Sequence, residues 1–366
     1  MRIPRPRRDR GIALIIVMMV IIVFSVLAGG FAYAMKVETK LARNTSWESD
    51  MEWLGRSGVE LGKYSLATYL MSPPPENSYT ALSQVWAGGP FNHTNEIVNV
   101  ALTGVEIGAG KVSVKIIDLE RKFSLATVTE ANPVILENAL MMVGADSADI
   151  PTIIDSYFDW VDLDKKTELE GAENQFYLNL PPPHSPHYAK DGPVDDMREL
   201  LLLKGMNEQI FWGTARLGVA TDRRDKSGRP LRMQRSMSAS VQTMPPQESG
   251  VGLIDLFVPM HGGGPRVNIN TASSEVLQLI PGLDKPLADS IVANRSAEPY
   301  RNPQEALMQG GADPIMVASL TPMLGVHSRH FEITVDAEIG NHKRKFIAVV
   351  ERRSARDVIT LYFTWK

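Results

Sequence analysis

The chain has 366 residues, a formal net charge of −4 and a hydrophobic content of 44%. This composition is that of a globular protein, and the length is compatible with two or three domains. The absence of cysteine excludes disulfides, thiolate metal sites and cysteine nucleophiles, and the acidic balance does not favour a phosphate-binding surface.

The first 34 residues combine a basic leader with a long apolar segment. Five arginines lie within residues 2–10, and residues 12–34 follow without a charge. A helix over 12–34 would be about 34 Å long, enough to cross a hydrocarbon layer of ~30 Å. We therefore predict one transmembrane helix, with the arginines holding the N-terminus in the cytoplasm and the rest of the chain on the other side of the membrane.

The junction between Gly11 and Ile12 differs from that of an ordinary secretory signal. Such a signal has an apolar core of 7–15 residues and a small-residue cleavage site after it. Here the apolar run is longer, and the best junction precedes it. A basic leader that ends in glycine before an unbroken apolar helix resembles the signal of type IV pilins and type II secretion pseudopilins. The resemblance implies that a prepilin peptidase removes residues 1–11 and leaves a net charge near −8; a plain signal anchor is the alternative.

The fifth residue after this junction is Ile16, where pilins of this family usually carry glutamate. A carboxylate in lipid is costly and persists only with a partner, such as the N-terminal amine of a neighbouring subunit. A chain without it cannot make that contact. Within the family, this exception is typical of the K-type minor pseudopilin of type II secretion systems (general secretion pathway protein K), which sits at the filament tip.

Helical periodicity continues beyond the membrane segment. Apolar residues recur at three- and four-residue steps until three prolines follow at 73–75. The spacing predicts a single helix over residues 12–72. Its first half would lie in lipid or in a filament core, and its second half would pack on a soluble domain.

Strand patterns flank a long section with helical periodicity. The strands are expected at residues 111–118, 330–339, 344–352 and 358–365. We predict an α+β protein in which the long N-terminal helix packs on a type IV pilin-like antiparallel sheet. The expected order is a β region at 73–126, a mainly α-helical insert at 127–324 with a long loop around 222–250, and C-terminal strands within 325–366.

Seven acidic residues crowd into the stretch 155–174: Asp155, Asp159, Asp162, Asp164, Glu168, Glu170 and Glu173. Calcium takes six to eight oxygen ligands, and a helix end that leads into a glycine-containing loop can supply them. The spacing does not match an EF-hand. From the residues alone, a solvated acidic loop and a calcium site both stay open.

A resemblance favours calcium. The sequence DWVDLD, followed by GAEN and YLN, resembles the calcium-binding loop of K-type pseudopilins. Carried over by position, it implies the ligands Asp162, Asp164 and Glu173 first, and Asp159 and Glu170 second. The following PVDDMRELLLLKGM resembles the next motif of the family and adds Asp195, Asp196 and Glu199 as possible rim ligands.

Residues 267–295 resemble a helix-hairpin-helix (SAM-like) unit. The structural positions are Asn268, Asn270 and Thr271 in NINTA, and Pro281 and Gly282 in the hairpin. We expect Thr271 to cap the first helix. DNA-binding units of this kind hold phosphate on the backbone of the hairpin, but here Asp284 places a carboxylate there. A structural role is therefore expected, and K-type pseudopilins contain the same unit in their insert.

Four segments in the expected order identify the chain as a member of the K-type minor pseudopilins. The resemblance implies a single-pass protein of the bacterial inner membrane, with a periplasmic globular domain that caps the pseudopilus tip and nucleates its assembly for protein export. The implied partners are the other minor pseudopilins, the major pseudopilin, the prepilin peptidase and the inner-membrane assembly platform. No catalytic motif is present, and no nucleic acid is expected. The alternative is a membrane-tethered helix-hairpin-helix protein of DNA uptake.

Overall fold

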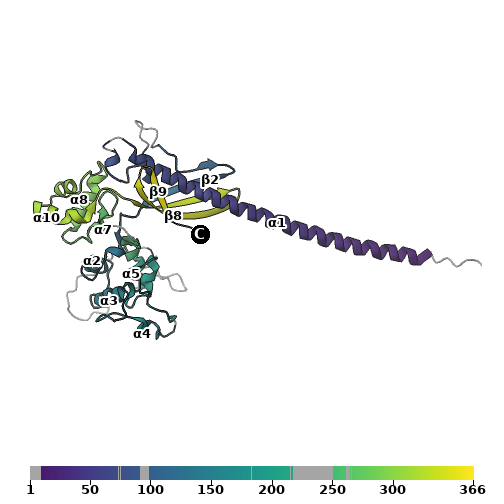
Figure 1. Ribbon diagram of the computed structural model, residues 1–366, viewed down its shortest axis with the longest axis horizontal. Coiled ribbons are helices and arrows are strands. Elements are labelled where there is room, and N and C mark those ends of the chain that lie inside the picture. The colour runs from purple at the N-terminus through teal and green to yellow at the C-terminus, as the bar shows by residue number, and fades with distance from the viewer. Residues whose placement is uncertain are drawn as a thin grey trace, which may run out of the picture.

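The computed structural model describes residues 10–72, 74, 76–90, 99–182, 184–214, 216, 250–260, 264 and 266–366. The basic leader before Arg10, and all of the predicted loop at 222–250 except its last residue, lie outside these ranges. The first element is helix α1, Arg10–Leu70, which runs unbroken through the predicted membrane segment and into the head. This confirms the single long helix expected from the periodicity (Figure 1).

The second half of α1 packs on a five-stranded antiparallel sheet with the order β1-β2-β7-β8-β9. The strands are β1 Val105–Ile107, β2 Gly110–Asp118, β7 His330–Ile339, β8 His342–Ser354 and β9 Asp357–Trp365. Four of them match the predicted strands within two residues, and the short β1 was not foreseen. Neighbouring strands β2 and β7 are far apart in sequence, so the sheet brackets the insert.

Glycines let α1 approach this sheet closely. A Cβ atom at Gly58 would overlap Val335, and one at Gly55 would overlap the ring of Phe346. The helix and the sheet thereby enclose a core of their own, which includes Leu66, Phe331 and Phe346.

The section between β2 and β7 is mainly helical and forms a second core. Its α-helices are α2 Val134–Met142, α3 Ile150–Val161, α4 Asn174–Tyr177, α5 Glu208–Trp212, α6 Leu253–Leu256, α7 Ser274–Leu277, α8 Lys285–Arg295, α9 Pro303–Gln309 and α10 Pro314–Leu320. Its 3-10 helices are η4 Leu125–Thr127, η5 Met197–Leu202 and η6 Thr321–Met323, while η1 Glu76–Ser78 and η2 Val85–Ala87 precede β1. Two small parallel sheets pair β3 Phe123–Ser124 with β4 Phe257–Val258, and β5 Val267–Asn268 with β6 Leu324–Gly325.

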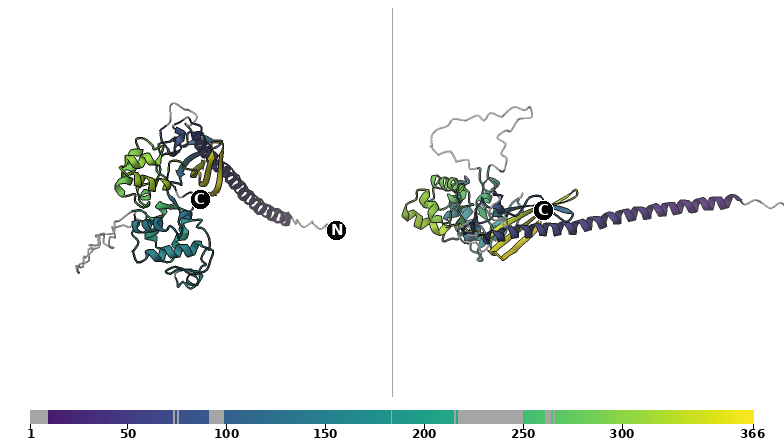
Figure 2. Two further views of the ribbon diagram at one scale, coloured as in Figure 1. Left: turned by 60° about the vertical axis from the view of Figure 1, so that its left-hand side comes forward. Right: turned by 90° about the horizontal axis from the view of Figure 1, so that it is seen from above.

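The insert lies at the end of the sheet opposite to the free half of α1. Helices α7–α10 continue beyond that end, and α2–α5 lie to one side of it (Figures 1 and 2). The molecule therefore has a long bare helix at one end and its bulkiest part at the other.

Candidate functional sites

The free half of α1 is apolar and has no cover within the chain. Its large apolar side chains from Ile12 to Leu41 are all exposed, and Ile16 is 57% exposed. The hydroxyl of Ser25 donates to the carbonyl oxygen of Ile21 at 2.7 Å, so this polar group is satisfied within the helix. Of the described helices, this one alone is long and apolar enough to span a membrane. Gly11 and Ile12 lie in its first turn, within the helix rather than at a break.

The acidic cluster is built where α3 ends. Asp159 lies in the last turn of α3 and is fully buried, and its Oδ1 accepts from the backbone N–H of Glu168 at 2.9 Å. The Oδ2 of Asp155 accepts from the backbone N–H of Glu170 at 3.0 Å. These two bonds fold the acidic loop back onto α3. The loop then reaches Glu173, the N-cap residue of α4.

Several carboxylate oxygens of this cluster are buried without a hydrogen-bond partner: Asp159 Oδ2, Asp162 Oδ1, Glu173 Oε1 and Asp191 Oδ1. Burial, followed by the charges of Asp164, Asp159 and Glu173, raises the pKa of Asp162 to about 6. Burial likewise raises the pKa of Asp159 and of Glu173. Buried acceptors of like charge that lack donors are costly, and a bound cation would satisfy them.

The predicted ligands are not all equivalent. Asp159, Asp162 and Glu173 supply the buried unpartnered oxygens. Asp164 is exposed and accepts from the backbone N–H of Lys166 at 2.7 Å, while the exposed Glu170 reaches the cluster through its backbone. Within the described ranges, no three acidic or histidine side chains are spaced to hold a metal ion. The carboxylates are thus gathered without forming a coordination shell.

The expected rim ligands lie in a different local network. Lys190 Nζ pairs with Asp195 at 2.6 Å and with Glu199 at 2.8 Å. Asp196 caps η5 and forms a capping box with Glu199. The structure therefore gives these three residues partners of their own, and their role as rim ligands stays a prediction. Asp191, which sequence reasoning missed, has the one positive φ (50°) among the non-glycine residues that the structure describes.

The NINTA residues are buried at the junction of insert and sheet. Asn268 Nδ2 donates to Ser328 Oγ at 2.7 Å, and the two polar ends of the Asn270 side chain bond the backbone of Tyr300. The prediction that Thr271 caps a helix is wrong: its hydroxyl donates to Asp118 Oδ2 at 2.5 Å. The cap of α7 is Ser273, two residues later, because its side chain accepts from the N–H of Val276.

The hairpin between α7 and α8 turns at Gly282, which has φ 89°, after the exposed Pro281. Asp284 caps α8 by accepting from the N–H of Leu287 at 3.1 Å. Lys285 pairs with Asp289 at 3.2 Å. The turn thus presents a carboxylate at the helix start and a lysine that is already paired, which does not favour phosphate.

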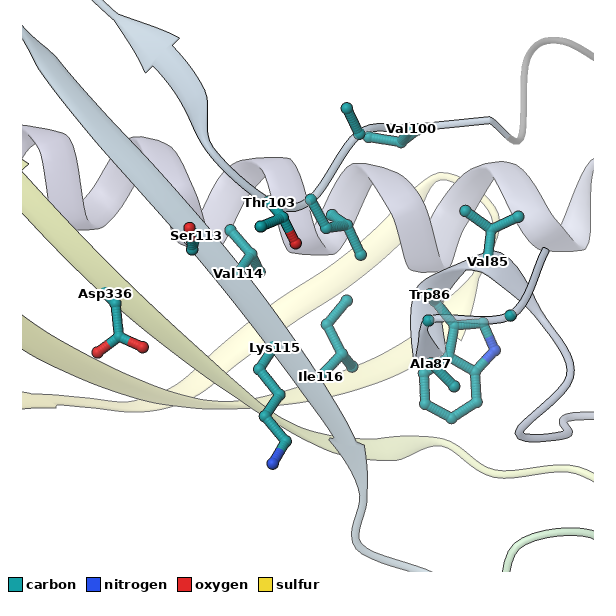
Figure 3. Close-up of a pocket in the computed structure, with 14 residues that line it drawn as sticks. Val85, Trp86, Ala87, Val100, Thr103, Ser113, Val114, Lys115, Ile116 and Asp336 are labelled. Carbon is teal, nitrogen blue, oxygen red and sulfur yellow. The ribbon is translucent and has the colours of Figure 1, made fainter. Parts of the chain in front are cut away.

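A groove of about 540 Å³ lies beside β2, between η2 and residues 100–103 (Figure 3). Val85, Trp86 and Ile116 give it apolar walls, and Lys115 and Asp336 stand at its rim. Its serine, Ser113, accepts from the backbone N–H of Gly104 at 3.1 Å. These residues include no paired nucleophile and base, so the groove does not point to catalysis.

Comparison with known protein families finds matches for two segments of the chain. Residues 119–216 and 267–327 match two domain models, both described as type II secretion system protein K. The chain matches the type II secretion system protein K family in both of these segments. This confirms the resemblance to K-type minor pseudopilins, a family of structural secretion-system components rather than enzymes.

Named relatives agree with this assignment. A type II secretion system protein K of Klebsiella pneumoniae is 25% identical over 217 residues, and one of Escherichia coli (strain K12) is 24% identical over 214 residues. Each match covers 56% of this chain and 60% of the relative. The crystal structure of the GspK-GspI-GspJ complex from enterotoxigenic Escherichia coli contains a chain with the same fold, at a TM-score of 0.61 and 16% identity. That likeness covers 89% of this chain and 99% of the other.

Proposed function

We propose that this minor pseudopilin caps the tip of the periplasmic pseudopilus and nucleates its assembly. The observation that carries the proposal is the position of the insert. It lies at the end of the head that faces away from the free half of α1, and it also extends to one side (Figure 1). In a filament whose subunits stack along their long helices, such a head would occupy the space of the next subunit.

Ile16 supports the same position. A subunit within the shaft offers a carboxylate to the N-terminal amine of its neighbour, and Ile16 has none to offer. We infer that this chain lies above the other subunits and accepts none above itself. Its partners would then be other minor pseudopilins, and the relative in the solved complex is bound to GspI and GspJ.

The helix and its leader fix the proposed route. Before assembly, residues 12–34 would span the inner membrane, with the arginines in the cytoplasm and the head in the periplasm. The prepilin peptidase would cut after Gly11, and the assembly platform would then move the helix from lipid into the filament core, where the major pseudopilin continues the shaft.

Calcium is part of the proposal. The unpartnered oxygens of Asp159, Asp162 and Glu173 form a set of hard oxygen donors beside the acidic loop, the kind of group that calcium prefers. When bound, the ion would neutralise their mutual repulsion and hold the acidic loop on α3. Asp164 and Asp191 are the further carboxylates at this cluster, and Glu170 is the least favoured of the proposed ligands.

The position of the chain in isolated pseudopili tests the proposal. The full chain carries a small epitope tag on the exposed α10, and gold labelling is counted along the filaments. We expect label at one end only, and a far lower abundance than that of the major pseudopilin. Label distributed along the shaft would contradict the tip assignment.

A further inference from the structure

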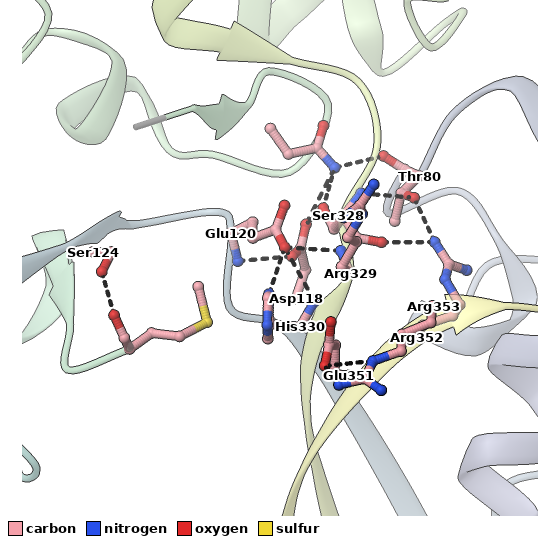
Figure 4. A network of polar contacts seen from close by, with 12 residues as sticks. Thr80, Asp118, Glu120, Ser124, Ser328, Arg329, His330, Glu351, Arg352 and Arg353 are labelled. Carbon is pink, nitrogen blue, oxygen red and sulfur yellow. Dashed lines mark hydrogen bonds and ion pairs between the residues drawn. The ribbon is translucent and has the colours of Figure 1, made fainter. Parts of the chain in front are cut away.

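The insert and the sheet have separate hydrophobic cores, joined by a buried polar network (Figure 4). The network contains Thr80, Asp118, Asn268, Thr271, Ser328 and Arg352, all of them buried. Asp118 ends β2 and Ser328 precedes β7, the two strands that lead into and out of the insert. Asn268 and Thr271 belong to the insert itself.

Asp118 is the centre of this network. Its Oδ2 accepts from Thr271 Oγ1 at 2.5 Å, from Ser328 Oγ at 2.7 Å and from Asn268 Nδ2 at 3.2 Å. Its Oδ1 accepts from the backbone N–H of Glu120 at 2.9 Å. One carboxylate therefore binds the insert and both connecting segments at once.

The sheet side of the network is held by Arg352 of β8. Its guanidinium donates to Thr80 Oγ1 and to the carbonyl oxygen of Ser328, both at 2.9 Å, and to the carbonyl oxygen of Leu66 in α1 at 3.2 Å. Thr80 in turn accepts through its carbonyl oxygen from Asn268 Nδ2 at 3.0 Å. Arg352 thus anchors the network to the pilin-like core.

We propose that these residues form a latch: with Asp118 neutral the insert is fixed on the sheet, and ionisation of Asp118 favours opening and rotation of the insert. Two packed bodies that meet through a polar network have a natural hinge at the connecting strands. Because three side-chain hydrogen bonds at this junction converge on one carboxylate, its charge contributes to how firmly the hinge is held.

The direction of this pH dependence follows from the burial of Asp118. Burial, only partly offset by the hydrogen bonds of Thr271 and Ser328, raises the pKa of Asp118 from 3.8 to about 6. An open latch would expose the carboxyl to water and return its pKa toward the ordinary value. The closed form therefore holds the proton more tightly, and raising the pH through 6 shifts the balance toward the open form. A difference of about two units between the pKa values of the closed and open forms changes the ratio of closed to open forms by about a hundredfold in total, from below pH 3.8 to above pH 6. About tenfold of this change falls between pH 5 and pH 8.

Other titratable groups lie beside the latch, so an experiment on its pH dependence needs a control. Glu120 accepts from His330 Nδ1 at 2.8 Å and adds negative charge beside Asp118. Burial, together with the positive charge of Arg352, lowers the pKa of His327. His327 and His330 both lie beside the network, so the pH effect must be shown to depend on Asp118.

The absence of cysteine makes a distance measurement direct. Cysteines replacing Lys343 on β8 and Ile315 on α10, which are 74% and 84% exposed, carry spin labels in the full chain in nanodiscs. Double electron–electron resonance then gives the distance between the two labels, and so between the sheet and the insert. We expect one narrow distribution at pH 5 and a second, broader population at pH 8. A control pair within the insert, Ile315→Cys with Met141→Cys on α2, is expected to stay unchanged.

Variants of the network test whether Asp118 is the group that responds to pH. Asp118→Asn should keep the narrow distribution at both pH values. Thr271→Val, which removes one donor to the carboxylate, should enlarge the broad population at pH 8 and gives a second measurement if Asp118→Asn does not fold. Identical wild-type distributions at pH 5 and pH 8 would overturn the latch. A broad population that persists in folded Asp118→Asn would assign the pH effect to the histidines and overturn the role of Asp118.

Discussion

The missing side chain of Gly171 makes room for the carboxylate of Asp159. A Cβ atom at Gly171 would overlap Asp159 Oδ2 and would lie 3.2 Å from the carbonyl oxygen of Asp155. The acidic loop can therefore close over the end of α3 only because this residue is glycine. The close approach buries Asp159 Oδ2 without a hydrogen-bond partner, which ties the geometry of the loop to the proposed cation.

Gly171→Ala should displace the loop from Asp159. We expect a loss of about 1–3 kcal/mol in the free energy of unfolding, as for other overpacked sites, and a reduced rise in melting temperature on adding calcium. Gly192→Ala is the matched control, because its Cβ would meet only the carbonyl oxygen of Lys190 at 3.8 Å. If both variants melt like the wild type with and without calcium, the close packing at Gly171 has no role in the site.

Calcium should stabilise the full chain, and more so at higher pH. A ligand at a hundredfold excess over its Kd stabilises the folded state by about 2.7 kcal/mol. Without metal, the raised pKa of Asp162, about 6, means that its contribution to stability is greatest at low pH and is lost as the pH rises through 6. Protons compete with calcium below that pH. The rise in melting temperature on adding calcium should therefore be larger at pH 7.5 than at pH 5.

Asp162→Asn separates this effect from that of Asp118, whose pKa is raised in the same direction. The variant should show a smaller calcium-induced rise at pH 7.5, and magnesium should replace calcium poorly because it prefers a tight octahedral shell. A melting temperature that does not respond to calcium or to chelator at either pH would contradict the calcium proposal.

The fold could be predicted wherever a sequence pattern repeats. The long helix and the strands β2, β7, β8 and β9 follow from periodicity, and the turn at Gly340 and Asn341 follows from residue type. β1 is too short to show a pattern, since it consists of Val105–Ile107 alone. Thr271 was misread as a cap because its neighbours fit a capping pattern, while Asp118, its true partner, is 153 residues away in sequence.

The acidic site could be predicted only in part for the same reason. The local crowding of carboxylates identified Asp159, Asp162 and Glu173. Asp191 is separated from them by a proline-rich stretch and is placed by a positive φ, which no spacing reveals. The three acidic residues after it matched a family motif, yet the ion pair of Lys190 engages two of them and a helix cap engages the third.

The docking of α1 on the sheet depends on Gly58. Its Cβ would overlap Val335 Cγ1, whereas a Cβ at Gly62 would lie 3.0 Å from Ile333. We expect Gly58→Ala to destabilise the head by about 1–3 kcal/mol despite the better helix propensity of alanine, and Gly62→Ala to cost less. Denaturant unfolding of the full chain in detergent measures both. Equal stability of the two variants and the wild type would show that the helix does not need this close contact.

Removal of the leader should occur after Gly11. Mass spectrometry of the membrane-extracted protein is expected to give a mature chain that begins at Ile12, because the glycine directly precedes the apolar helix. Gly11→Leu should block this step by replacing the small residue at the cut. A mature N-terminus at Met1, or one after residue 34, would contradict processing at this junction.

The tip position should be lost when both features that support it are removed. β2 and β7 are neighbours, with Asp118 opposite Phe331, so a short loop can replace residues 123–326 and leave the sheet intact. Combined with Ile16→Glu, this change restores the carboxylate and clears the space above the head. Because α10 is removed, the epitope tag is placed after the exposed Lys366 in these variants. We expect the doubly altered chain to enter the filament shaft, where gold labelling should find it along the whole length.

Each of the two changes, made alone, shows whether the insert or Ile16 excludes the chain from the shaft. Ile16→Glu retains the insert, so steric exclusion should keep that variant at the end of the filament. Removal of residues 123–326 alone leaves Ile16, and the next subunit would still lack a partner for its N-terminal amine. We expect at most rare entry into the shaft in that case. If the doubly altered chain folds but is still found only at filament ends, neither the insert nor Ile16 determines the position, and contacts with the other minor pseudopilins must do so.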